Sequence, residues 1–246
     1  MNEAMQEFVR YAKLFDLKNP DIMRKFHHTF RVVEYAKDIA RSEGLSDRDV
    51  ILAMKCALLH DVARFRQFKM YNTYVDAKSF DHGDEGARIL GTNKFVNRYT
   101  KDADEQKIII KATRNHNKFQ VEDGLTEREL LFTNIVRDAD KLDIMMEQGN
   151  TINGKFILNP LYLRPFQEKR LYKNKAVTGE YEVTMRTMAF IYDMNFKYSY
   201  EFIKENNIIN DKVELLMSHS TSLGIFEYLA KICNEYVDER IEELSK

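Results

Sequence analysis

The chain has 246 residues, and its 38 Lys+Arg nearly balance its 39 Asp+Glu, giving a net charge of −1. Glycine and proline are scarce, at 9 and 3 residues, which argues against strand-rich sandwiches, glycine-looped dinucleotide folds and proline-rich linkers. No apolar run is long enough to span a membrane, no secretory signal is visible, and two cysteines do not make a disulfide framework. We therefore expect a reduced, cytoplasmic protein with no membrane partner and no nucleic acid as a bulk partner.

Helical spacing of apolar residues begins near the N-terminus. Phe8, Ala12 and Phe15 share one face of a predicted first helix. A second helix is predicted over residues 20–41, and Gly44 follows it as a stop signal.

The next segments are also mostly helical. A helix is predicted over residues 48–60, with Asp47 as its N-cap. Residues 66–80 are less periodic and rich in Tyr, Asn and Lys, which favours a loop. Two further helices are predicted over residues 82–91 and 101–117.

A capping box opens the following helix. Thr126 stands in the N-cap position and Glu129 three residues later, and the helical pattern continues to Gly149. From about residue 151 to residue 178 the helical periodicity fades, and this stretch includes a basic segment, 155–175. This segment could steer an anionic substrate or form a lid, but a solvated loop is the favoured interpretation.

Helical patterns return over residues 180–205 and 222–245. The last of these carries an apolar stripe that could be core or the seam of a homodimer. The stripe consists of Phe226, Leu229, Cys233, Val237 and Ile241. With no repeat and no linker, we expect a single all-α domain over residues 1–246.

Histidines and aspartates recur in a distinctive order on successive predicted helices. His28 lies mid-helix, His60 precedes Asp61 at the end of an apolar helix, His82 starts a helix and His116 ends one. Imidazoles and carboxylates are ligands of Zn, Mn and Fe, and helices can project them into a bundle core. We expect His27 and His219 to be core or helix-capping side chains rather than metal ligands.

The acidic helix that follows offers further carboxylates. Positions 138 and 140 are about 200° apart around a helix, so either Asp138 or Asp140 could ligate, but hardly both. Asp143 shares a face with Asp140.

These residues resemble the HD-domain superfamily of metal-dependent phosphohydrolases, in its stand-alone form. The resemblance covers residues 21–148, with 151–246 as a helical extension, and rests on HTFRV, ALLHDVARF, DHGDEGARIL, NHN and DADKLD. It implies a helical bundle with additional C-terminal helices. The family often has Ile-Gly-Lys or Ile-Gly-Arg after the HD pair, where this chain has Val62, Ala63 and Arg64.

The same resemblance implies the metal ligands. His28, His60, Asp61 and Asp140 match the mononuclear set. His82 and His116 match the extra pair of binuclear members, in which Asp61 would bridge the ions. The implied cofactor is one or two divalent ions of Mn, Fe, Mg, Zn, Co or Ni.

Two basic residues join Asp61 as candidate catalytic residues. Arg64 follows Asp61 by three positions, so a continuing helix would place it on the metal face to bind phosphate oxygens. A salt bridge to a loop carboxylate is an equal alternative. Lys141 adjoins Asp140 and could reach the substrate or the rim of the site, or it could be a solvated lysine.

The leading hypothesis is a phosphohydrolase that cleaves a small phosphate ester or anhydride, with a nucleotide as the expected substrate. A metal-bound hydroxide would attack phosphorus, and Arg64 would neutralise the developing charge. Two alternatives remain open: a di-iron oxygenase of the HD-domain type, and a non-catalytic protein that senses a nucleotide.

Overall fold

The computed structural model is all-α in the residues that it describes, as predicted. Within these residues no strand forms, and one isolated backbone bridge joins Phe156 and Ser220. None of the described helices is long and apolar enough to cross a membrane. The described residues are 1–147, 149–172, 179–220 and 223–246.

The chain divides into two compact units, Met1–Asp140 and Lys141–Lys246. The boundary falls inside helix α7 (Glu127–Glu147), about ten residues before the predicted start of the helical extension. The single domain over residues 1–246 stays a prediction.

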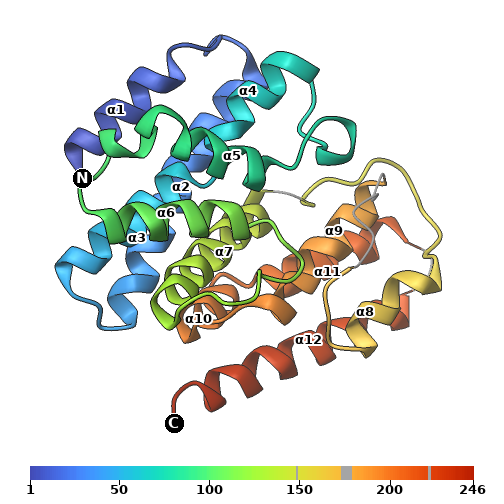
Figure 1. Cartoon of the computed structure of the whole chain (residues 1–246). Helices are drawn as coiled ribbons and strands as arrows, with labels where there is room; N and C mark the ends of the chain where they lie inside the picture. Colours follow the sequence, from blue (N-terminus) through green and yellow to red (C-terminus); the bar gives the residue numbers. More distant parts are fainter. Residues whose placement is uncertain (148, 173–178, 221–222) are drawn as a thin grey trace. The chain divides into compact units, whose positions relative to one another are not determined.

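Unit 1, residues 1–140, is a bundle in which α2 packs along α3 and α5 along α6 (Figure 1). Aromatic rings fill part of its core, where Phe8 lies between Phe26, Phe30 and Phe65 with ring centroids 5.8–6.2 Å apart. Besides the first part of α7, its helices are α1 (Asn2–Ala12), α2 (Pro20–Ser42), α3 (Asp47–Leu59), α4 (Val62–Tyr71), α5 (His82–Gly91), α6 (Ala103–Asn115) and the 3-10 segments η1 (Asp76–Lys78) and η2 (Thr92–Arg98).

Local signals explain where two of these helices begin. The Asn19 side chain accepts hydrogen bonds from the first free backbone N–H groups of α2, and Pro20 occupies the first turn. At the start of α7, Thr126 N–H donates to Glu129 Oε2 (2.8 Å) and Glu129 N–H donates to Thr126 Oγ1 (3.2 Å). The predicted capping box is confirmed.

Three predicted boundaries are wrong. The N-cap of α3 is Ser46, whose hydroxyl accepts from Asp49 N–H, rather than Asp47. The first helix ends at Ala12, so Phe15 lies outside it. Helix α4 covers residues 66–71 of the predicted loop, because it continues to Tyr71 and is followed by Asn72 in the left-handed conformation (φ 51°).

Unit 2, residues 141–246, is built around α12, which packs against α10 and α11. Four members of its apolar stripe are buried and Ile241 is half-buried, so the stripe is core. The helices of this unit after α7 are α8 (Arg164–Gln167), α9 (Glu180–Met188), α10 (Lys197–Glu205), α11 (Ile208–His219), α12 (Leu223–Glu243) and the 3-10 segments η3 (Pro160–Leu163) and η4 (Ala189–Asp193).

The basic segment 155–175 is only partly described. Lys155 is exposed and donates to the carbonyl oxygen of Ser218 (2.7 Å). Arg164 pairs with Glu168 (2.6 Å) on the surface. Two of its basic residues, Lys173 and Lys175, lie outside the described residues. A substrate-steering or lid role for the segment stays a prediction.

Candidate metal centre

The structure brings together six histidine and aspartate side chains in unit 1. Each comes from a helix or from the residue that flanks one, and five of the six residues are buried. They are His28 on α2, His60 after α3, Asp61 before α4, His82 at the start of α5, His116 after α6 and Asp140 on α7.

The junction of α3 and α4 explains how two neighbouring residues face one centre. His60 continues the helical conformation of α3, whereas Asp61 has φ −103° and ψ 20° as the residue that precedes α4. The chain therefore turns between the two helices at this pair, and both side chains point into the cluster.

The Asp61 carboxylate divides the cluster in two. Its Oδ2 lies 3.5 Å from His28 Nε2 and 3.4 Å from His60 Nε2. On the same side Asp140 Oδ1 lies 3.1 Å from His28 Nε2 and 3.7 Å from His60 Nε2. We call this group, His28, His60, Asp140 and Asp61 Oδ2, site A.

The other Asp61 oxygen faces a second pair of rings. Asp61 Oδ1 lies 3.5 Å from His82 Nε2 and 3.6 Å from His116 Nε2. We call His82, His116 and Asp61 Oδ1 site B. The four histidines of the predicted six thus face an oxygen of Asp61, and Asp140 faces two of these histidines, His28 and His60.

Hydrogen bonds at the far side of the rings fix which nitrogen faces the centre. His60 Nδ1 lies 2.6 Å from the carbonyl oxygen of Ala57, which can only accept, so this nitrogen carries a hydrogen. His60 Nε2 is buried and has no hydrogen-bond partner, although carboxylate oxygens stand on two sides of it. A buried nitrogen of this kind needs a cation or a proton between it and the carboxylates.

In site B the need for a cation between buried nitrogens is more direct. His82 Nδ1 donates to Asp76 Oδ2 (2.7 Å) and His116 Nδ1 donates to the carbonyl oxygen of Thr113 (2.7 Å). The two Nε2 atoms are 3.1 Å apart. Neutral rings held in this way point two lone pairs at each other, which is unfavourable unless a cation binds both. Rings whose outer N–H is held by a carboxylate or carbonyl are typical of metal-ligating histidines.

The electrostatics of the cluster also favour a cation. Burial lowers the pKa of His60, but the Asp61 and Asp140 carboxylates raise it to about 10, so a metal ion must displace a proton there. Burial, with the charge of Arg64, lowers the pKa of His82 to about 3. Burial also lowers the pKa of His116. Both site B rings are therefore neutral and able to ligate at neutral pH.

Both carboxylates are ionised. Burial raises the pKa of Asp61, but Lys25, His60 and Arg64 lower it to well below its ordinary value. Burial likewise raises the pKa of Asp140, and the hydrogen bonds and charges of His28 and His60 bring it well below the usual range. Asp138, the alternative ligand on this helix, is buried and lies outside both sites. Burial raises the pKa of Glu43, and the charge of Asp138 raises it further.

Sequence reasoning missed two residues that contact the cluster. Lys25 is buried on α2, and its Nζ lies 2.7 Å from Asp61 Oδ2. Its position three residues before His28, on the same helical face, was the available signal. Asp76 comes from η1 and holds His82, and nothing local in the sequence marked it.

The structure gives the surroundings of the two basic candidates. Arg64 does lie beside Asp61 (Nε to Oδ1, 3.3 Å), but it also makes the salt bridge to a loop carboxylate, with Nη1 3.0 Å from Asp76 Oδ1. Lys141 is buried rather than solvated, and its Nζ lies 2.9 Å from Asp193 Oδ2 within unit 2. A catalytic role for either residue stays a prediction.

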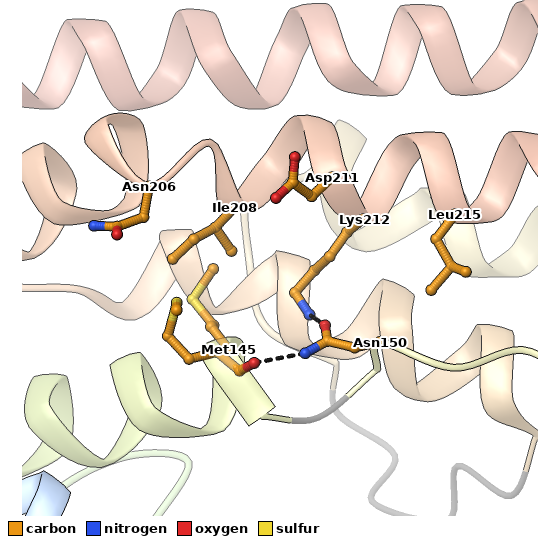
Figure 2. Close-up of a pocket in the computed structure, with 8 residues that line it drawn as sticks. Met145, Asn150, Asn206, Ile208, Asp211, Lys212 and Leu215 are labelled. Atoms are coloured by element: carbon orange, nitrogen blue, oxygen red, sulfur yellow. Dashed lines mark hydrogen bonds between the residues drawn. The ribbon is translucent and has the colours of Figure 1, made fainter.

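A cavity of about 380 Å³ lies in unit 2 (Figure 2). Lys212 is buried beside it and donates to Asn150 Oδ1 (2.8 Å), while Asn150 Nδ2 donates to the carbonyl oxygen of Met146 (2.5 Å). The lining residues are Met145, Met146, Asn150, Asn206, Ile208, Asp211, Lys212 and Leu215. No histidine, cysteine or carboxylate pair in this lining suggests a metal site.

Comparison with protein families identifies the part of the chain that carries the cluster. Residues 26–145 match the family model described as HD domain. This range includes all six residues of sites A and B and agrees with the predicted extent of 21–148. Comparison with curated proteins and with solved structures gave no significant match.

Proposed function

We propose, from the HD domain that the chain carries over residues 26–145, that this protein is a metal-dependent phosphohydrolase. Its substrate would be a small phosphate ester or anhydride, with a nucleotide as the favoured class. The cofactor would be one or two divalent ions, one in site A and one in site B, drawn from Mn, Fe, Mg, Zn, Co or Ni. We place the protein in the cytoplasm.

The observation that carries the proposal is the division of the Asp61 carboxylate between the two sites. One oxygen faces His28 and His60, and the other faces His82 and His116. A bridging carboxylate between two sets of imidazoles is the arrangement that a two-ion phosphohydrolase requires. When bound, the ions would supply a water of lowered pKa and positive charge for the phosphate oxygens.

The chain's own groups would prepare this chemistry. The backbone carbonyls of Ala57 and Thr113 fix the His60 and His116 rings, and the carboxylate of Asp76 fixes His82. Burial keeps bulk water from the ligand atoms and strengthens their interactions with charge. No serine or cysteine nucleophile is needed, since the ions would activate water directly.

The first test is elemental mass spectrometry on protein purified without chelator or a metal-affinity column. We expect close to two ions per chain, and hydrolysis of a phosphate ester within a panel of nucleoside mono-, di- and triphosphates. Asp61→Ala should lose both ions, and its turnover should fall by at least about a thousand-fold. Asp138→Asn is the matched control, because Asp138 is a buried aspartate outside both sites.

The possible results separate the hypotheses. Full turnover by Asp61→Ala would refute the site. A single ion per chain would remove His82 and His116 from the ligand set. Iron together with oxygen consumption would favour the di-iron oxygenase, and tight nucleotide binding with no turnover under any metal would favour the sensor.

A further inference from the structure

Lys25 is a cation that approaches site A from outside the ligand set. Its ammonium donates to Asp61 Oδ2 (2.7 Å), the oxygen that also faces His28 and His60. The side chain is buried, at 9% exposure, and its other neighbour is the Tyr74 ring, with Nζ 6.0 Å from the ring centroid. One of the three ammonium hydrogens is used by Asp61, so others can serve another acceptor.

Arg64, the phosphate-binding residue expected from the sequence, is already held elsewhere. Its Nη1 donates to Gln67 Oε1 (2.7 Å), to the carbonyl oxygen of Tyr74 (2.7 Å) and to Asp76 Oδ1 (3.0 Å). Its Nε donates to Asp61 Oδ1 (3.3 Å). The Nε and Nη1 groups of Arg64 thus contact four acceptors and support the loop that carries Asp76, and Nη2 is the group that these contacts do not use.

Charge balance distinguishes the two cations further. Arg64 has Asp76 as a carboxylate partner in addition to Asp61, whereas Lys25 has Asp61 alone among the residues that the structure describes. Two divalent ions would bring four positive charges against the two carboxylates of Asp61 and Asp140. The Lys25 ammonium would then be a buried charge without a matching anion, which is costly. A phosphate dianion bound against site A would supply that anion.

We propose that Lys25, rather than Arg64, is the residue that binds a phosphoryl oxygen of the substrate at site A. The inference rests on the proposed function, since it assigns the phosphate-binding side chain of that site. Arg64 then has a positioning role, in which it holds Asp76 and, through Asp76, the His82 ring.

The test measures binding of inorganic phosphate to zinc-loaded protein by isothermal titration calorimetry, with metal content determined on the same samples. Lys25→Met keeps the length of the side chain and removes its charge. We expect it to retain both ions and to bind phosphate at least about ten-fold more weakly, the loss expected for a charge-assisted hydrogen bond. Lys25→Arg should restore part of the affinity, because it returns a cationic donor.

Lys55→Met is the matched control. Lys55 is a half-buried lysine of α3 that pairs with Glu105 (3.2 Å) and belongs to neither site. Its variant should bind phosphate as the wild type does. If Lys25→Met does not fold, the wild-type protein is measured by NMR instead. Its Lys25 ¹⁵Nζ resonance, which is assigned by its absence in Lys25→Arg, should shift when phosphate is added.

Two outcomes would overturn the inference. The first is unchanged phosphate affinity in Lys25→Met, or a Lys25 resonance that phosphate does not move. The second is loss of metal from Lys25→Met with unchanged phosphate affinity per loaded site, which would make Lys25 a support of the metal centre. Failure of the proposed function would instead be seen in the wild type, as metal-loaded protein that hydrolyses no phosphate ester.

Discussion

Two regions of the molecule bury polar side chains, and they do so in opposite ways. In the candidate metal centre of unit 1, two acceptors face each other: His82 Nε2 lies 3.1 Å from His116 Nε2, and both rings donate from Nδ1. Beside the cavity of unit 2, donor faces acceptor, since Lys212 donates to Asn150. Both arrangements are buried, so burial alone does not distinguish them.

The two regions differ in whether their buried polar groups need a further partner. The Lys212–Asn150 pair already joins a donor to an acceptor. The cluster in unit 1 is complete only when positive charge is placed among its nitrogens and oxygens. A mismatch of buried donors and acceptors is therefore the better indicator of a binding centre, and the following predictions test this contrast.

The largest effect is expected on removal of metal. Without ions the lone pairs of site B face each other directly, so unit 1 should open more readily. Ligand at a thousand times its Kd stabilises a protein by about 4 kcal/mol, which corresponds to about a thousand-fold change in exchange protection. Hydrogen exchange followed by mass spectrometry should show faster exchange in peptides of α3 and α6 after chelation. Peptides of α11 and α12 serve as the internal control, and an equal change there would contradict the contrast.

A smaller and more local effect is expected from Asp76→Ala. This change removes the acceptor of the His82 Nδ1 hydrogen and leaves site A untouched. Loss of such a supporting carboxylate typically weakens metal binding by about 10- to 100-fold. Competition with a fluorescent zinc indicator should show one weakened and one unchanged site. Asp84→Asn, an exposed aspartate of α5, is the control. Equal weakening of both ions would mean that Asp76 supports the whole cluster rather than site B.

The parts of the fold that the sequence predicted are those set by local interactions. Asn19 and Pro20 start α2, and Thr126 with Glu129 starts α7, through contacts within three residues. The predicted loop over residues 66–80 is wrong for residues 66–71, and the reason is non-local. Gln67 appears polar in the sequence but is buried, because its amide donates to Ser79 Oγ and to the carbonyl oxygen of Phe80, both twelve or more residues later.

The same distinction separates the site residues. The histidines and Asp140 could be identified because their order along the chain resembles a known family. Lys25 was marked only by its helical spacing from His28, since its partner Asp61 lies 36 residues further along the sequence. Asp76 acts through a 3-10 segment in a loop, where no periodicity indicates which side chain turns inward. Burial of Lys212 likewise depends on packing that the sequence does not show.

A third effect is expected at Lys212 and depends on pH. Burial lowers the pKa of this lysine from 10.5 to about 8, and the charge of Asp211 raises it only in part. Below pH 8 both the folded and the unfolded chain carry the proton, so the folded state bears the full cost of a buried ammonium. Between pH 8 and 10.5 the folded chain has released its proton while the unfolded chain still binds it. The free energy of unfolding should therefore rise with pH across this window, by up to about 3 kcal/mol.

Lys212→Met isolates this contribution, because the variant has no amine to titrate. Chemical unfolding of wild type and variant at several pH values between 7 and 10 should give a difference that moves in favour of the wild type as pH rises. A constant offset from the lost hydrogen bond to Asn150 does not affect this slope. Lys231→Met is the control for loss of a lysine charge at an exposed position. A difference that does not vary with pH would mean that the Lys212 ammonium is well solvated through the cavity, and the two regions would then differ in access to water as well as in pairing.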